Sequence, residues 1–169
     1  TLRPVPPTPG GPDPLDLGPD AARWALLHPA PHDRPHTDPG QHLAQHESNP
    51  LFRIRYAYAR TRALTRNAAD LGFTAAPGAT DASAHDLLGA LGDHPPVQAT
   101  AARRHAPDRL TRHLVRTADA FLAQAHTVLP LGDEKPSAAH RSRLALAEAA
   151  GTVLAGGLSL LGISAPEYL

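Results

Sequence analysis

The stretch from Ser48 to Leu71 places five arginines on what the pattern predicts to be one long helix. Asn49 is a favourable N-cap because its side-chain oxygen can accept from a first-turn N–H, and Pro50 suits the first helical position because it has no N–H to leave unpaired. At about 100° per residue, apolar and small side chains gather on one side of this helix. They are Ile54, Ala57, Tyr58, Thr61, Leu64, Thr65 and Ala68. We therefore predict a helix that packs this side against a core.

The five arginines avoid the apolar side and fall into two rows. One flank carries Arg55, Arg62 and Arg66. A face turned further from the core carries Arg53, Tyr56 and Arg60. No acidic residue lies between Pro50 and Asn67, so partners three or four residues away cannot cancel this charge. A solvated face is the ordinary interpretation of such a helix. The unbalanced charge and the exposed ring favour instead a surface that binds phosphates through arginine and stacks a base on Tyr56.

Composition favours an all-α fold. Aromatic residues make up only 4% of the 169 residues while 41% are hydrophobic, so the core must be built from Leu, Ala and Val in closely packed helices. The formal net charge is zero, but residues 50–116 hold ten arginines against five acids, and residues 1–49 hold three against six. The absence of cysteine excludes disulfides, thiol nucleophiles and cysteine-ligated metal sites. No apolar run is long enough to cross a bilayer and no secretory leader opens the chain, so we expect a soluble cytoplasmic protein without membrane association.

We expect three parts along the chain: a disordered Pro/Gly-rich tail over 1–16, short helices and a Pro-rich loop over 17–48, and a helical bundle over 49–169. In the second part, a helix over 17–27 is expected to bury Trp24 and Leu26, and another short helix is expected over 40–47. In the third, periodicity and turn residues predict helices over 50–71, 83–91, 95–105, 107–129 and 137–161.

The last two of these helices have clear patterns. The helix over 107–129 carries an apolar stripe of Leu110, Leu114, Ala118, Phe121, Leu122 and Ala125. Its opposite side carries a second, solvent-facing arginine stripe of Arg109, Arg112 and Arg116. In the helix over 137–161, three glycines indicate close approach of a neighbouring helix: Gly151, Gly156 and Gly157.

Several motifs together resemble the helical anticodon-binding domain of arginyl-tRNA synthetases. N-P-L-F-R-I-R-Y-A-Y-A-R is similar to the family's N-P-V-F-Y-V-Q-Y-A-H-A-R, and L-G-P-D-A-A-R-W resembles V-G-V-D-A-A-R-Y. P-D-R-L-T-R-H-L resembles P-H-R-L-x-x-Y-L, and V-L-A-G-G-L-S-L-L-G-I-S-A-P-E-Y-L resembles V-L-x-x-G-L-x-L-L-G-I-x-x-P-E-R-M. The likeness covers residues 17–169, with the motifs in the family's order.

The resemblance implies an all-α bundle of the class I synthetase anticodon-binding type. Such a domain holds the anticodon stem and loop of a tRNA, with the loop bases opened toward its first long helix and its C-terminal end. By position, Tyr56 and Arg60 match the tyrosine and the arginine of Q-Y-A-H-A-R, while Tyr168 and Leu169 fall where the family ends in Arg-Met.

The chain also departs from the family's pattern. Arg55 stands where the family usually has glutamine, Tyr58 and Asp108 where it has histidine. Glutamine offers both a donor and an acceptor to a base edge whereas arginine offers only donors, so we expect phosphate binding with relaxed base specificity. The expected RNA-binding residues are Arg53, Arg55, Tyr56, Tyr58, Arg60, Arg62, Arg66, Arg109, Arg112, Arg116, Tyr168 and Leu169.

No catalytic residue, metal site or cofactor is expected. His42 and His46 are spaced i,i+4, but no third ligand follows at a fixed spacing. The chain has neither the His-Ile-Gly-His-like nor the Lys-Met-Ser-Lys-Ser-like motif by which the synthetases hold ATP. As given, it is expected not to aminoacylate tRNA.

Three functions stay open at this point. The first is a non-catalytic module that binds the anticodon stem-loop of a tRNA, with an arginine-accepting tRNA as the candidate. The second is a protein-interaction or regulatory paralogue that has lost specific tRNA recognition and pairs with a protein such as a synthetase. The third is the C-terminal part of a longer arginyl-tRNA synthetase-like enzyme.

Overall fold

The computed structural model describes residues 12–169, and helices are the only regular elements in that range. The α-helices are α1 Gly18–Leu27, α2 Pro39–His42, α3 Pro50–Asp70, α4 His85–Arg104, α5 Pro107–Gln124 and α6 Ala138–Leu160. Short 3-10 helices occur at η1 Pro14–Leu17, η2 Ala82–Ala84 and η3 Ala125–Thr127. The prediction of an all-α fold is therefore confirmed. None of the helices in the described range is both long and apolar enough to span a membrane.

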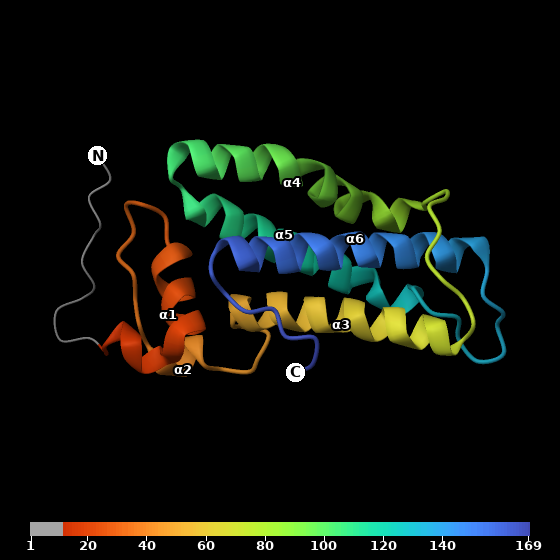
Figure 1. The fold of residues 1–169 in the computed structure, drawn as a ribbon, viewed down its shortest axis with the longest axis horizontal. Coiled ribbons are helices and arrows are strands. Elements are labelled where there is room, and N and C mark those ends of the chain that lie inside the picture. Colours follow the sequence, from red (N-terminus) through yellow and green to blue (C-terminus); the bar gives the residue numbers. More distant parts are fainter. Residues whose placement is uncertain (1–11) are drawn as a thin grey trace.

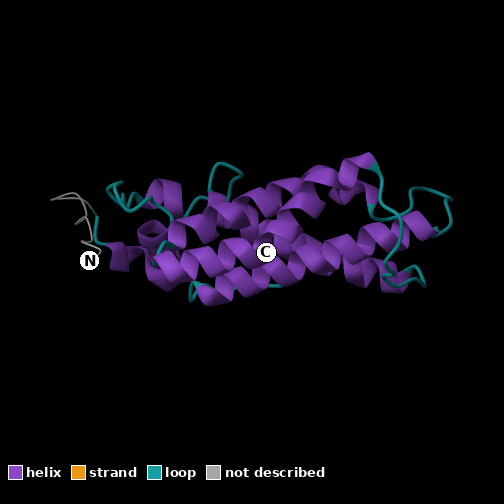
Figure 2. Ribbon diagram, turned by 90° about the horizontal axis from the view of Figure 1, so that it is seen from above, coloured by secondary structure: helices purple, strands orange, loops and turns teal. Residues whose placement is uncertain are grey.

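The four long helices run along the long axis of the molecule (Figures 1 and 2). Helix α5 packs against α3, α4 and α6, and α3 also packs against α6. Helix α1 stands across one end of this bundle, and the segment after α6 crosses α3 (Figure 1). Two stretches that are far apart in the sequence, α3 and the C-terminus, therefore lie side by side.

The predicted apolar stripes form the core. Ile54, Leu64, Leu114 and Phe121 are at most 1% exposed, because burying such side chains is the main favourable contribution to folding. Trp24 is 1% exposed and joins the same cluster, so α1 is anchored to the bundle as expected. The caps also agree with the sequence pattern: the side chain of Asn49 accepts from the N–H groups of Leu51 and Phe52 at the start of α3.

Helix α4 differs from the prediction of two separate helices over 83–91 and 95–105. It continues through Pro95 and Pro96, although each proline removes one backbone donor from the helix. The carbonyl groups left without a helical donor are those of Leu91 and Gly92, four residues before each proline; Gly92 is exposed and Leu91 is half-buried. Figure 1 shows α4 bending partway along its length, as prolines inside a helix cause.

Two expectations near the N-terminus were wrong. Leu26 is 48% exposed, because α1 buries its alanines and Trp24 on the other side. The helix expected over 40–47 is limited to α2. At its end and just after it, the carbonyl groups of His42 and Ala44 accept hydrogen bonds from the side-chain amide of Asn49 rather than from N–H groups of a continuing helix. Of the N-terminal segment expected to be disordered over 1–16, residues 1–11 lie outside the described residues, and its last residues belong to η1.

The glycines of α6 divide into two kinds. A Cβ atom on Gly151 would lie 2.5 Å from Oγ1 of Thr61 on α3, and one on Gly157 would lie 2.4 Å from a methyl carbon of Leu114 on α5. A Cβ atom on Gly156 would meet nothing within 4 Å. The expected close approach is confirmed at two of the three glycines and is wrong at Gly156.

Candidate nucleic-acid interface

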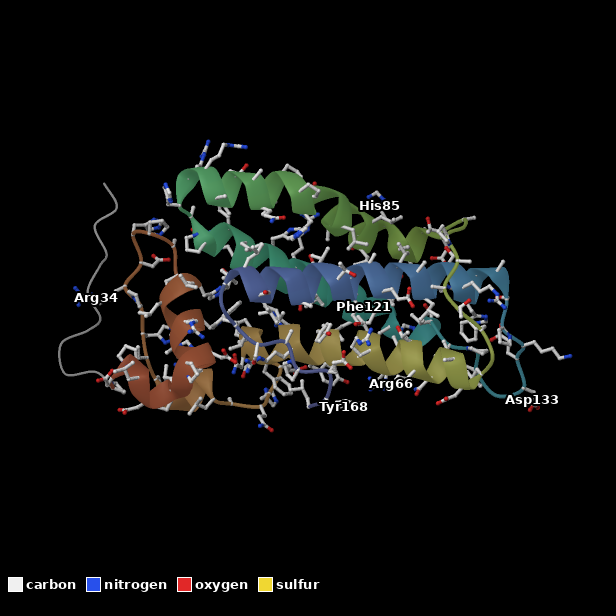
Figure 3. All side chains as sticks on the ribbon, in the orientation of Figure 1. Arg34, Arg66, His85, Phe121, Asp133 and Tyr168 are labelled. Carbon is white, nitrogen blue, oxygen red and sulfur yellow. The ribbon has the colours of Figure 1, made fainter. Side chains whose placement is uncertain are left out.

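An open groove of about 510 Å³ lies between α3 and the C-terminal residues 164–169, which we call the tail. It brings together five of the twelve predicted RNA-binding residues: Tyr56, Arg60, Arg66, Tyr168 and Leu169. Helix α3 contributes three of them because positions 56, 60 and 66 lie on neighbouring turns. Figure 3 shows the side chains of Arg66 and Tyr168 next to each other on the outer side of α3.

Aromatic surface is available along this groove. Tyr56 is 46% exposed, as predicted, and its ring stacks on that of Phe52 with 6.1 Å between centroids and an interplanar angle of 16°. Tyr168 is 71% exposed, and the guanidinium of Arg66 lies over its ring at 4.5 Å from the centroid. Flat, exposed rings beside a cation are suited to stacking unpaired bases.

The tail is held on α3 by the flank of Arg55, Arg62 and Arg66. Arg55 donates to the backbone carbonyl of Ser164 at 3.1 Å and to its hydroxyl at 2.8 Å. The Nε of Arg62 lies 3.2 Å from a carboxylate oxygen of Glu167. One row of arginines thus fixes the beginning and the end of the tail, and the tail forms one wall of the groove.

Asp20 of α1 joins this arrangement. Its carboxylate accepts hydrogen bonds from Arg55 and from the hydroxyl of Ser164. Burial works to raise the pKa of Asp20, but the hydrogen bonds from Ser164 and the charge of Arg55 outweigh it and hold the pKa below its usual value. Arg55 therefore joins α1, α3 and the tail, and it lines the neighbouring groove beside α1 rather than the one with Tyr56.

The expectation of five uncancelled positive charges on α3 was wrong. Asp20 pairs with Arg55 and Glu167 pairs with Arg62, while Asp119 of α5 pairs with Arg53 at 3.1 Å. All three carboxylates belong to other elements, so local spacing along α3 could not reveal them. Within residues 12–169, the α3 arginines without a carboxylate partner are those in the groove, at positions 60 and 66.

The second arginine stripe is exposed, as predicted, but lies on a different surface. Arg112 pairs with the buried Asp108 at 3.1 Å, and Arg116 pairs with Asp93 of α4 at 2.9 Å. Both arginines line a groove of about 600 Å³ along α5, whereas Arg109 is exposed at the start of that helix. These three arginines therefore do not belong to the groove with Tyr56.

Tyr58 also lies elsewhere. It is half-buried against the core and, with Arg62, lines a separate groove between α3 and α6. The twelve predicted residues are thus distributed over several surfaces.

Besides two alanines of α3, the sequence interpretation missed three residues that line the groove: Gln45, Phe52 and Glu167. Phe52 could have been found, because it lies four residues before Tyr56 on the same helical face. Gln45 lies in the irregular segment between α2 and α3, where no periodicity relates it to the helix face.

The histidine pair considered for metal binding is engaged in local contacts. The ring of His42 lies 2.9 Å from the carbonyl oxygen of His36, and the ring of His46 accepts from the N–H of Ser48 at 3.3 Å. Over the described residues, no group of three or more His, Cys, Asp or Glu side chains is arranged to hold a metal ion.

The chain is similar to known proteins over most of its length. A family model described as the DALR anticodon binding domain matches residues 54–169. An arginine–tRNA ligase of Paenarthrobacter aurescens (strain TC1) is 40% identical over 160 residues, which cover 90% of this chain and 29% of the relative. The chain thus spans about three-tenths of the length of that relative.

Two solved structures have the same fold. The arginyl-tRNA synthetase of Thermus thermophilus matches with a TM-score of 0.73 and 24% identity, over 96% of this chain and 29% of that one. A protein described as an arginyl-tRNA synthetase of Campylobacter jejuni matches with a TM-score of 0.72 and 21% identity, over 91% and 34%. With the family model matching most of the described bundle, the chain belongs to the DALR anticodon-binding domain family.

Proposed function

We propose that this chain binds the anticodon stem-loop of a tRNA in the groove between α3 and the tail, and that it contributes binding rather than catalysis. The observation that carries the proposal is the groove itself, which joins Arg60, without a carboxylate partner in the described part of the chain, to the exposed ring of Tyr56. The family's anticodon-binding description and the arginine–tRNA ligase relative support a tRNA as the ligand. An arginine-accepting tRNA is the first candidate.

The residues in and around the groove are proposed to have three different roles in RNA binding. Tyr56 and Phe52 offer a stacking surface, worth about 1–3 kcal/mol per base in single-strand binding. Arg60 supplies a guanidinium for a phosphate, whose planar donors fit phosphate oxygens. Arg55 and Arg62 act through the tail by holding it on α3, so they are positioning residues rather than phosphate contacts.

The exposed stripe on α5 is proposed as a second, purely electrostatic contact. Arg109, Arg112 and Arg116 are all exposed, and two of them share their charge with a carboxylate. Such a surface suits the phosphates of the paired stem, where no base is read. We take residues 49–169 as the binding unit and 17–48 as the segment that leads into it.

The test measures binding of a fluorescent anticodon stem-loop hairpin over a series of salt concentrations. Phosphate neutralisation releases counterions, so each lost contact should lower the log–log salt slope by about 0.7 on single strands. We expect Arg60→Ala to weaken binding and reduce the slope, and Tyr56→Ala to weaken binding at an unchanged slope. Lys135→Ala, in the loop between α5 and α6, is the matched control that removes a cation from outside the groove. Undetectable binding, or a slope that Arg60→Ala leaves unchanged, would overturn the proposal.

A second candidate is a protein-interaction or regulatory paralogue that no longer recognises a specific tRNA. The observation that favours it is the pairing of Arg53, Arg55 and Arg62 with carboxylates, which leaves less positive surface than α3 alone would present. Capture of partners from a lysate with and without ribonuclease separates the two: a partner such as a synthetase that survives RNA digestion favours this candidate. The comparisons are also compatible with a piece of a longer arginyl-tRNA synthetase-like enzyme, which reading the genomic frame upstream of Thr1 would test.

A further inference from the structure

Base reading in this groove needs a side chain that can distinguish one base edge from another. Arg60 and Arg66 carry donors only, so the base edges that they can read are those that offer acceptors, such as N7 and O6 of guanine. The carboxylate of Glu167 is engaged by an arginine. The aromatic rings stack on any base and therefore select little. Among the residues that line the groove, Gln45 has the carboxamide, with an acceptor oxygen beside a donor nitrogen.

The backbone next to Gln45 is fixed by one buried side chain. Asn49 is 5% exposed, and its Nδ2 donates to the carbonyl oxygens of His42 and Ala44, both at 2.9 Å. The Oδ1 of the same amide accepts from the N–H of Leu51 at 3.1 Å and so caps α3. A single amide thus ties the segment before α3 to the first turn of that helix.

The side chain of Gln45 itself is exposed at the end of the groove. Gln45 and Phe52 line both the groove with Tyr56 and the adjoining one of about 290 Å³ beside α1, so Gln45 lies where the two grooves adjoin. A fixed backbone with an unengaged polar end is the arrangement expected of a group that meets a ligand rather than one that stabilises the fold.

We propose that Gln45 reads the hydrogen-bonding edge of one unstacked base held against the Phe52–Tyr56 rings, and that Asn49 positions it. The inference rests on the proposed function and adds base selectivity to it. Whereas the sequence predicted relaxed specificity because Arg55 replaces a glutamine, the groove obtains an amide from a different segment. A glutamine that makes two hydrogen bonds to a base edge discriminates against the wrong base by about ten-fold or more.

The test uses the full chain and RNA hairpins in which each loop position in turn carries each of the four bases. We expect the wild type to prefer one base at one position by about ten-fold. Gln45→Ala should reduce that preference to less than about two-fold with an unchanged salt slope, because no phosphate contact is lost. Gln41→Ala, an exposed glutamine of α2 outside the groove, is the control and should keep the preference. Asn49→Ser keeps an N-cap for α3 but lacks the amide donors, so it should also lose the preference.

The outcomes distinguish failure of the role of Gln45 from failure of the proposed tRNA binding. Tight binding by the wild type without preference at any position would overturn the role of Gln45 and leave the proposed function standing. A preference that survives in Gln45→Ala would overturn it as well. A preference that survives in Asn49→Ser, with thermal unfolding checked in parallel, would remove the positioning role. Failure to bind any hairpin would overturn the proposed function and the inference together.

Discussion

The distance between α3 and α6 is set at Gly151, and replacing this residue by alanine tests the packing that orients α3. A Cβ atom there would lie 2.5 Å from Oγ1 of Thr61 and 3.3 Å from its Cβ. Thr61 is 2% exposed and its hydroxyl donates to the carbonyl of Tyr58 at 2.7 Å, so rotating the side chain away breaks this hydrogen bond. Gly156, five residues later on the same helix, has nothing within 4 Å of its added Cβ.

Two opposing contributions decide the result. Alanine in place of glycine inside a helix stabilises by about 0.5–1 kcal/mol, because glycine loses more backbone freedom on folding. Forcing an extra carbon into a packed interface costs about 1–3 kcal/mol. Gly156→Ala should therefore raise the free energy of unfolding by up to about 1 kcal/mol, whereas Gly151→Ala should lower it by about 0–2.5 kcal/mol.

The assay is thermal and urea unfolding followed by circular dichroism. The two variants should differ by about 1–3 kcal/mol, which corresponds to a melting temperature about 2–12 °C lower for Gly151→Ala in a chain of this size. Adding Thr61→Ala to Gly151→Ala should recover part of the loss, since residues in contact are not additive. If Gly151→Ala proved as stable as Gly156→Ala, or the double variant showed no coupling, the close approach of α3 and α6 at this point would be refuted.

Three further predictions concern stability. His113 of α5 stacks on His94 of α4 at 5.2 Å, and burial first, with the neighbouring His94 and Arg116, lowers the pKa of His113. As the pH falls, the unfolded chain therefore takes up a proton at this residue before the folded chain does, so the free energy of unfolding should fall as the pH drops below about 6.5. His113→Gln should make this pH dependence weaker, as measured by urea unfolding at several pH values. Ser137 caps α6 through its hydroxyl, and Ser137→Ala should cost about 1 kcal/mol in the same unfolding assay. His105 ends α4 with a φ of 50°, a left-handed conformation, so His105→Gly should raise the melting temperature by relieving about 0.5–1 kcal/mol of strain, and an unchanged or lower value would contradict it.

Part of the candidate site could be predicted from local pattern, and part could not. The exposed ring of Tyr56 and the start of α3 at Asn49 follow from periodicity and cap chemistry, which act within one or two turns. The family likeness named Tyr168 as a candidate RNA-binding residue, and the structure places its ring under Arg66 of α3. Gln45 could not be predicted, because its position depends on an irregular segment that a buried amide folds back.

The sequence by itself determined the all-helical fold, the buried sides of α3 and α5 and the exposed ring of Tyr56. These properties follow from hydrophobic period, alanine-rich composition and helix caps, all of which are local. Only the tertiary structure decided which arginines keep an uncancelled charge. Asp20, Asp119 and Glu167 reach α3 from distant elements, and electrostatic pairing depends on distance in space rather than along the chain. The folding of α1, α5 and the tail onto α3 pairs three of its five arginines with carboxylates and leaves Arg60 and Arg66 in the groove.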